Sequence, residues 1–299
     1  MFLCIICAGD YMKNYLVKAY AMHEGVRIYA AITTGIVDYV QQRFNMWPTS
    51  TAALGRVLTM AAIMSSTYKN DDYLNIYVNG DGPIGKITCE AHDGKVRGFC
   101  QNPGVYLSHN NGKLDVASAV GSGFIEVVKD LHLREPFSST SEIISGEIAE
   151  DFTYYFAKSE QIPSSVGLGV LVDPDGKVAS AGGFLIQVMP GCKDEDITKL
   201  EEKLKTLKSC SKMINDGYTA LDIINEITDG DYEFLEEKEL SYECNCSKER
   251  FERGLISLGK TELLDILNTD KKIEINCNFC NKHYEFNAEE IQKLAEEAK

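Results

Sequence analysis

The pattern of apolar and polar positions along the chain separates three regions with different expected structures. Up to about residue 190, helix-like and strand-like stretches alternate. The stretch TSTAALGRVLTMAAIMSST, which begins at Thr49, contains helix-forming residues with an apolar face. It predicts a helix that starts after a cap at Thr49 or Ser50.

The strands of this first region are expected to pair as hairpins. In YLNIYVNGDGPIGKITCEAHDGKVRGFCQNP, Ile76 and Val78 fall on one face, and Ile87 and Cys89 repeat the pattern after a turn. Further on, SVGLGVLVDPDGKVASAGGFLIQVMPG predicts two apolar strands joined by a DPDG turn. Hairpin-connected strands interspersed with helices predict an α+β fold rather than a doubly wound parallel sheet.

Residues 191–241 show no strand-like alternation and carry 14 acidic against 7 basic residues. Their apolar residues recur every three or four positions, which predicts helices with narrow apolar stripes. The stripes consist of Ile197, Leu200, Leu204 and Leu207 and, after a break at Asp216-Gly217, of Leu221, Ile224 and Ile227. Because such helices are unstable alone in water, they need a surface to pack on. Either they are permanently docked, or they form a marginally stable linker that can undock.

Composition and charge exclude several classes of partner. The 299 residues are 44% hydrophobic and 25% charged, as in ordinary globular proteins with one large domain or one medium and one small. The formal net charge is −15 and no run of five basic residues occurs, which argues against a nucleic-acid surface or an electrostatic membrane anchor. No apolar run approaches the roughly 20 residues of a membrane helix. The N-terminus also lacks the basic start of a secretory signal, so we expect a cytoplasmic protein.

Two glycine motifs match nucleotide-binding patterns by letter but not by context. Gly80–Gly85 matches G-x-G-x-x-G, yet an alternating strand follows where a helix must begin, so a hairpin connection is expected. Gly254–Thr261 matches G-x-x-x-x-G-K-T, but it follows the charged segment SKERFER rather than a buried strand. Neither G-x-S-x-G nor H-E-x-x-H occurs in the sequence, and no catalytic residue is expected.

Ten cysteines in a chain without an export signal indicate a reducing compartment, where paired thiols more often bind metal or do redox chemistry than form permanent crosslinks. Cys4 and Cys7 form a C-x-x-C pair in an apolar stretch and are expected to be buried or incidental. The isolated thiols are expected to be small buried hydrophobes: Cys89, Cys100, Cys192 and Cys210. His283 is expected beside a metal site or exposed.

Four cysteines in the last region, residues 242–299, are the strongest chemical signal. They are Cys244, Cys246, Cys277 and Cys280, a C-x-C pair and a C-x-x-C pair with thirty residues between them. This is the ligand set of a tetrahedral zinc site with four thiolates. The region has few large apolar side chains and ends in an acidic amphipathic helix, NAEEIQKLAEEAK, so its core alone is expected to be marginal. Structural zinc then supplies about 10 kcal/mol or more of folding free energy, and its removal unfolds the region.

The C-x-C spacing favours a reversible switch over a plain zinc ribbon that only holds a tail together. In an extended chain, residues i and i+2 point to the same side, so both sulfurs of Cys244 and Cys246 can reach one metal. Without the metal, these thiols are the nearest oxidation partners, and the small ring of their disulfide should be strained and easily reduced. Zinc keeps the sulfurs as thiolates, the form that oxidants attack.

Long stretches in all three regions resemble a known family. CNCSKER, the spacing to CNFCNKHYEF and the following NAEEI resemble the redox domain of the 33-kDa heat-shock protein family, the redox-regulated holdase chaperones of bacteria. KNYLVKAYAMHEGVRIYAAITT, SGEIAEDFTYYFAKSEQIPSSVGLGVLV and AGGFLIQVMPG are similar to its N-terminal domain. The resemblance covers about residues 12–299. Family members usually begin near the equivalent of Met12, so residues 1–11 are an atypical extension whose Cys4 and Cys7 have no family role.

The resemblance implies an ATP-independent chaperone, not an enzyme, with three parts. These are a client-binding and dimerisation domain at residues 1–190, a helical linker at 191–241 and a redox-switch domain at 242–299. When reduced, the four cysteines hold one Zn²⁺ per chain and the protein is inactive. Oxidative stress releases zinc and joins Cys244 to Cys246 and Cys277 to Cys280. The switch and linker then lose structure, and the protein forms a homodimer and holds unfolding client proteins.

Two other functions stay open on the residues alone. A thiol–disulfide oxidoreductase would use Cys277 and Cys280 catalytically, although that class favours a lone C-x-x-C at a helix N-terminus in a thioredoxin-like βαβ pattern. A constitutive zinc-ribbon interaction module would bind its partner regardless of oxidants.

Overall fold

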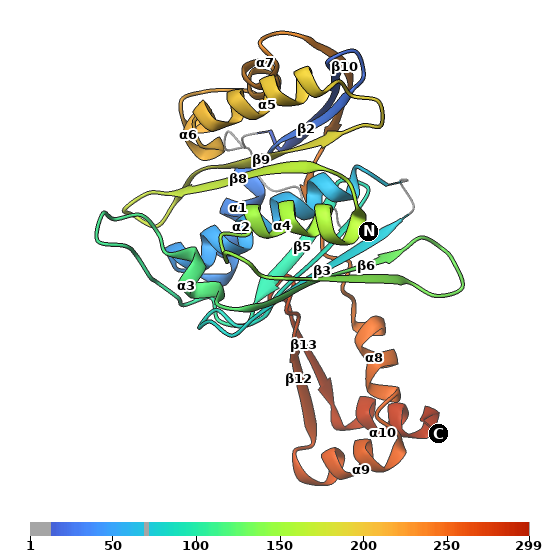
Figure 1. The fold of residues 1–299 in the computed structure, drawn as a ribbon. Helices are drawn as coiled ribbons and strands as arrows, with labels where there is room; N and C mark the ends of the chain where they lie inside the picture. Colours follow the sequence, from blue (N-terminus) through green and yellow to red (C-terminus); the bar gives the residue numbers. More distant parts are fainter. Residues whose placement is uncertain (1–12, 69–71, 299) are drawn as a thin grey trace. The chain divides into compact units, whose positions relative to one another are not determined.

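The computed structural model describes residues 13–68 and 72–298, which form a large unit ending at Tyr242 and a small unit beginning at Glu243 (Figure 1). Helices and mostly antiparallel sheets make up the large unit, and the small unit adds a hairpin among helices. The predicted α+β fold class is thereby confirmed. Cys4, Cys7 and the predicted extension of residues 1–11 lie outside the described residues.

Two sheets, A and B, form the framework of the large unit. Sheet A has, in spatial order, β10 (Tyr232–Glu239), β1 (Tyr15–Ala21), β2 (Val26–Ile32), β9 (Val178–Val188) and β8 (Ser164–Val172). Sheet B has, in spatial order, β11 (Ser241–Tyr242), β5 (Lys95–Cys100), β4 (Ile87–His92), β3 (Tyr73–Gly80), β6 (Gly123–Asp130) and β7 (Phe137–Glu142). Neighbouring strands are antiparallel except for the short parallel pair of β11 with β5.

The hairpins follow the predicted alternation of apolar positions. In the β3–β4 pair, Val78 lies opposite Ile87 and Ile76 opposite Cys89, with all four side chains buried. The G-x-G-x-x-G stretch connects these two strands without a helix, as its context predicted. The DPDG turn joins β8 to β9, and its Gly176 has a φ of 82°, a conformation that glycine adopts without strain.

The helix α2 (Pro48–Ser65) packs against strands of both sheets and lies between them in Figure 1. It is buried around nearly its whole circumference, not on one face only. The helix also begins earlier than predicted, because Thr49 and Ser50 do not cap it. The Thr49 hydroxyl donates to the Leu107 carbonyl at 2.8 Å and accepts the Leu107 N–H at 2.9 Å, so it fixes a neighbouring loop instead. Among the described residues, no helix is long and apolar enough to cross a membrane.

One face of sheet A packs on α2 and on shorter helices from the same part of the chain. These are α1 (Thr34–Phe44) and α4 (Ala149–Tyr155). The π-helical turn η1 (Phe156–Glu160) continues α4 and contacts β7 of sheet B, and α3 (Val116–Val120) packs on α2. Leu16, Tyr29 and Leu185 point from sheet A into this core. Their neighbours along the strands point the other way, so the opposite face of sheet A is apolar as well.

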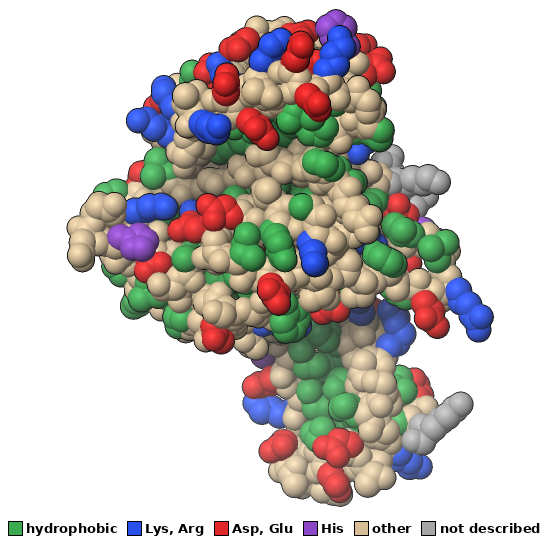
Figure 2. All heavy atoms as spheres, in the orientation of Figure 1, with side chains coloured by type: hydrophobic (Ala, Val, Ile, Leu, Met, Phe, Trp, Pro, Cys, Tyr) green, Lys and Arg blue, Asp and Glu red, His purple; other side chains and the backbone are tan. Residues whose placement is uncertain are grey.

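Residues 191–241 cover that opposite face. They form α5 (Asp194–Thr206), α6 (Cys210–Asn215) and α7 (Ala220–Thr228). The predicted stripes lie on α5 and α7, except that Leu207 directly follows α5. Leu200, Ile224 and Ile227 are buried in a core that includes Val17 and Ile28 of sheet A. In Figure 2 the surface over α5 and its neighbours is rich in intermingled acidic and basic side chains.

The end of this segment corrects the prediction of helix alone, because Tyr232–Glu239 forms strand β10 at the edge of sheet A. Most side chains of β10 are exposed, so no alternation of apolar positions marks it as a strand. Its backbone pairs with β1, and ion pairs add to the ladder: Glu236 lies 3.4 Å from Lys18, and Glu237 pairs with Lys13.

Substitution of Ile224 tests the docking of α7 on sheet A. Ile224 is fully buried, whereas Leu221 on the same helix is only half-buried. We expect Ile224→Ala to lower the free energy of unfolding by about 2–5 kcal/mol, because it leaves a cavity at the interface. Leu221→Ala, the control, should lower it much less. Urea unfolding and amide exchange within α5–α7 measure both effects, and equal losses would contradict the packing described.

Candidate metal centre

The small unit is built from three helices and one hairpin. Its elements are α8 (Lys248–Ile256), α9 (Lys260–Thr269), β12 (Lys272–Asn276), β13 (His283–Asn287) and α10 (Ala288–Glu297). The predicted C-terminal helix is α10, and Asn287 and Glu290 form a capping box at its start. Gly254 lies inside α8 and Gly259 directly precedes α9, so no buried strand leads into the G-K-T stretch, as predicted.

The core of the small unit is short. Its fully buried members are few: Leu263, Phe286, Ile291 and Ala295, with Leu255, Cys277, Tyr284, Leu294 and Ala298 nearly so. A core of this size supplies little stability by itself, since small domains commonly need a metal or crosslinks in addition. The cysteine cluster therefore bears on the folding of this unit as well as on its chemistry.

The tight turn between β12 and β13 holds Cys277 and Cys280. The Cys277 carbonyl accepts the N–H groups of Cys280 at 3.3 Å and of Asn281 at 2.7 Å, and the Cys277 N–H donates to the Lys282 carbonyl at 2.9 Å. Asn281 adopts a left-handed conformation with a φ of 52°, which asparagine tolerates better than most residues. The turn brings both thiols to the end of the hairpin.

The other pair, Cys244 and Cys246, lies on the segment between β11 and α8. The Ser247 side chain caps α8 by accepting the Arg250 N–H at 3.3 Å. The Arg250 Nη1 donates to the Asn245 Oδ1 at 2.9 Å, which orients the residue between the two thiols. The helix start thus helps to position the C-x-C pair.

All four sulfurs lie within 4.8 Å of one another. The Sγ of Cys244 is 3.7 Å from that of Cys277, and the Sγ of Cys246 is 3.4 Å from that of Cys280. Around a tetrahedral zinc with Zn–S bonds near 2.3 Å, sulfurs lie about 3.8 Å apart. None of the four is in a disulfide bond. The arrangement fits a thiolate-binding metal such as zinc and brings together the four residues singled out in the sequence.

The surroundings affect the thiols unequally. Burial disfavours the Cys246 thiolate, but hydrogen bonds from the Tyr284 hydroxyl and the neighbouring thiols outweigh it and lower the pKa of Cys246 to about 7. Burial raises the pKa of Cys277 and Cys280, against backbone N–H groups that donate to their sulfurs. Without a metal, Cys246 is therefore the most readily ionised of these three.

Tyr284 is a functional candidate that the sequence analysis missed. Its hydroxyl donates to the Cys246 Sγ at 3.1 Å, and its ring packs on Phe251 with centroids 4.9 Å apart. In β13 it alternates with the buried Phe286, so the pattern HYEFN indicated an inward side chain. Nothing local indicated that this side chain would meet a thiol 38 residues earlier.

The other thiols among the described residues, and His283, are not part of the cluster. Cys89, Cys100 and Cys210 are buried as predicted, and burial raises the pKa of Cys100 and of Cys210 to about 12. Cys192 is only half-buried, because it lies in the surface connection between β9 and α5, so that prediction was wrong. His283 is exposed, and its Nδ1 lies 2.9 Å from the Asn276 Oδ1.

Comparison with known proteins places this chain in a class of chaperones. A sequence model of the family described as Hsp33 protein matches residues 14–287, and the chain belongs to this family. The 33 kDa chaperonin of Bacillus licheniformis is 48% identical over 287 residues, which cover 95% of this chain and 99% of the relative. That of Bacillus subtilis is 47% identical with the same coverage.

A solved structure agrees with these sequence relatives. The crystal structure of the 33 kDa chaperonin (heat shock protein 33 homolog) from Thermotoga maritima matches with a TM-score of 0.89 and 35% identity. The match covers 95% of this chain and 98% of that one. The resemblance stated from the sequence is confirmed as membership of the family.

Tyr284→Phe tests the hydrogen bond to Cys246. Phenylalanine keeps the ring on Phe251 but removes the hydroxyl donor. We expect Zn²⁺ affinity to fall about tenfold, since partners of metal ligands typically contribute 10- to 100-fold. Competition with a chromogenic chelator measures the change, and Tyr77→Phe in the large unit is the matched control. Unchanged affinity in Tyr284→Phe would show that the hydroxyl does not support the ligand.

Proposed function

We propose that the protein is a redox-regulated, ATP-independent holdase chaperone and not an enzyme. The observation that carries the proposal is the meeting of four thiols, none in a disulfide, from two distant segments of a small unit with a small apolar core. Membership of the Hsp33 family and relatives named 33 kDa chaperonin support the chaperone role. We expect the protein to act in the cytoplasm, where thiols are kept reduced until oxidants appear.

In the resting state, we propose that Cys244, Cys246, Cys277 and Cys280 hold one Zn²⁺ per chain. When bound, the ion keeps the sulfurs as thiolates and supplies folding free energy that the short core lacks. Tyr284 orients Cys246, and the β12–β13 turn orients Cys277 and Cys280. The resting form is inactive because the apolar face of sheet A is covered.

In the oxidised state, each pair of thiols forms one disulfide. For each pair, two thiolates and two protons react with one molecule of hydrogen peroxide, the S–S bond forms, and two molecules of water leave. Disulfide sulfurs are no longer thiolate ligands, so the metal is lost and the small unit loses structure. We propose the pairing Cys244–Cys246 and Cys277–Cys280, because closing a ring over one or two residues costs less chain entropy than closing one over thirty.

The linker then uncovers the client-binding surface. Only Leu200 of α5 is buried, whereas α7 buries a broader apolar face, so α5 is the weakest part of the cover. Release of α5 together with α6 and α7, which pack directly on the sheet, would expose apolar strands of sheet A, including Ile28, Phe184 and Ile186. We propose that residues 1–190 use this face to hold unfolding client proteins and to form the homodimer of the activated state.

The thioredoxin-like alternative finds no support in the geometry. Cys277 and Cys280 lie in a turn between two strands, whereas redox-active C-x-x-C pairs of that class lie at a helix N-terminus. The constitutive zinc-ribbon module and the switch predict different responses to oxidants. The module would bind its partner equally before and after oxidation, whereas the switch would change its activity.

Peroxide treatment at raised temperature tests the switch. We expect release of about one Zn²⁺ per chain, measured with a chromogenic chelator. The same treatment should turn on suppression of client aggregation, measured by light scattering without ATP. Cys192→Ser, which removes a partly exposed thiol outside the cluster, should respond like the wild type. Oxidised protein that is as inactive as reduced protein would overturn the proposal.

Mass spectrometry of the oxidised protein tests the pairing. We expect proteolytic fragments with disulfides from Cys244 to Cys246 and from Cys277 to Cys280. In the structure, sulfur contacts also run between the two pairs, from Cys244 to Cys277 at 3.7 Å and from Cys246 to Cys280 at 3.4 Å. Crosslinks along those contacts would contradict local pairing and indicate oxidation of a still-folded cluster.

A further inference from the structure

A groove of about 860 Å³ lies in the large unit beside β8, the edge strand of sheet A opposite β10. It is lined by residues 168–174 of the chain, by part of α2, by the loop before α3 and by the connection between α5 and α6. Its volume falls within the range of about 300–1,000 Å³ that is usual for ligand sites. No cysteine of residues 13–68 and 72–298 lines it.

The backbone of β8 directs peptide groups into this groove. The Val188 N–H of β9 donates to the Pro163 carbonyl at 2.9 Å, so the Pro163 carbonyl faces β9. Peptide groups alternate sides along a strand, and the Val166 N–H accordingly turns away from β9 and donates to the Thr153 Oγ1 at 3.1 Å. By the same alternation, the peptide groups of Leu168 and Val170 face away from β9.

The two halves of the β8 edge differ in whether another element covers their backbone groups. Helix α4 covers the first half through Thr153. Beyond it, at Leu168 and Val170, no further strand pairs with β8 in the part of the chain that the structure describes. Unpaired groups on an edge strand are a template for another extended chain. The groove is the space in which such a chain would lie.

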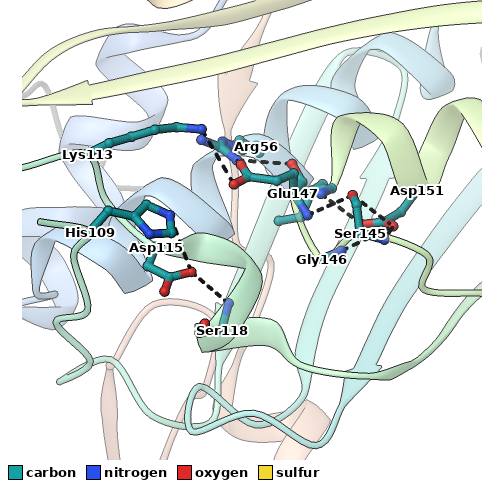
Figure 3. Close-up of polar contacts among 10 residues, drawn as sticks. Arg56, His109, Lys113, Asp115, Ser118, Ser145, Gly146, Glu147 and Asp151 are labelled. Atoms are coloured by element: carbon teal, nitrogen blue, oxygen red, sulfur yellow. Dashed lines mark hydrogen bonds and ion pairs between the residues drawn. The ribbon is translucent and has the colours of Figure 1, made fainter. Parts of the chain in front are cut away.

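The walls of the groove suit apolar side chains. The exposed side chains of Tyr106 and Leu171 face it, with 53% and 38% of their surfaces accessible. Arg56 and Lys113 pair with Glu147 at the end of the groove, as Figure 3 shows. Glu150 and Asp173 also line the groove, so its carboxylates outnumber its basic side chains. Arg56 Nη1 lies 2.7 Å from the Glu147 Oε2, and Lys113 Nζ lies 3.6 Å from the Glu147 Oε1. The groove is therefore poorly suited to a phosphate or another free anion.

We propose that this groove, the β8-edge groove, binds an extended segment of an unfolded polypeptide as an added strand on β8. The proposal rests on the holdase function and assigns one client-binding site to it. A polypeptide supplies alternating donors and acceptors that match Leu168 and Val170, and apolar side chains at every second position contact Tyr106 and Leu171. The backbone contacts make binding independent of client sequence, as a holdase requires.

The groove adjoins the helical segment that covers sheet A. Ser209 and Ser211, at the start of α6, line it, and a Cβ atom on Gly169 would lie only 2.5 Å from the Ser211 backbone nitrogen. Undocking of α5–α7 therefore removes one wall. A client strand on β8 can then extend its side chains onto the uncovered apolar face. The groove is thus the part of the client-binding site that is already formed before the helices undock.

Binding of a short fluorescent peptide to the reduced, zinc-loaded full chain tests the groove in its described state. The peptide carries valine at alternate positions and is compared with a twin that is N-methylated at the residues that would pair with β8. We expect the twin to bind at least about tenfold more weakly by fluorescence anisotropy, because it loses two backbone donors. Equal binding of the two peptides, or binding of neither, would overturn the proposal.

Two variants locate the site. Val170→Pro removes the N–H that faces the groove while sparing the ladder to β9, and we expect about fivefold weaker peptide binding, the effect of one hydrogen bond. Tyr106→Ala should weaken binding similarly. Tyr73→Ala, a tyrosine of similar exposure on β3 of sheet B, is the matched control and should bind as the wild type does. Thermal unfolding verifies that each variant folds. The comparison with the N-methylated peptide uses wild-type protein and therefore does not depend on the folding of a variant.

Failure of the groove and failure of the holdase function are distinguishable. If oxidised wild type suppresses client aggregation while Val170→Pro and Tyr106→Ala bind peptide normally, the groove is wrong and the function stands. If the peptide binds as expected but oxidised wild type never holds clients, the groove stands and the holdase function is wrong.

Discussion

Both faces of sheet A are apolar, so both must be kept from water, and most of the architecture follows from this requirement. One face is covered by α2 and its neighbours, which belong to the same part of the chain as the sheet. The other is covered by residues 191–241, whose helices carry narrow apolar stripes and a charged outer surface. Residues 191–241 can therefore leave this face without unfolding the rest of sheet A. A proposed switch needs only to destabilise a segment that is marginal on its own, because the binding surface beneath is already folded.

The small unit shows which part of a site a sequence can encode locally. The spacing of Cys244, Cys246, Cys277 and Cys280 was sufficient to predict one four-thiol cluster, since few other arrangements satisfy two close pairs. Tyr284 could not be predicted as a partner of Cys246, because their contact depends on how α8 and the hairpin pack. Ligand identity is thus local information, whereas the hydrogen bonds that tune a ligand depend on the tertiary fold.

The same distinction explains which elements of the large unit were predicted. Strand β3 buries every second side chain and β9 nearly all of them, and both the alternation and the continuous apolar run are visible in the sequence. Strand β10 buries almost none, and it is a strand only because β1 offers an edge to pair with. The start of α2 was misplaced for a related reason: the hydroxyls of Thr49 and Ser50 bind a loop that lies more than fifty residues later in the chain.

The order of elements along the chain has a consequence during synthesis. The four strands β1, β2, β8 and β9 are complete at Val188, but the last covering helix, α7, ends at Thr228, 228 − 188 = 40 residues later. At about 5–20 residues per second, the ribosome needs roughly 2–8 seconds to make them. Until then, the apolar face of these strands has no cover from its own chain. Slower translation of this stretch lengthens the interval in which a new molecule can capture a neighbouring nascent chain instead of closing on itself.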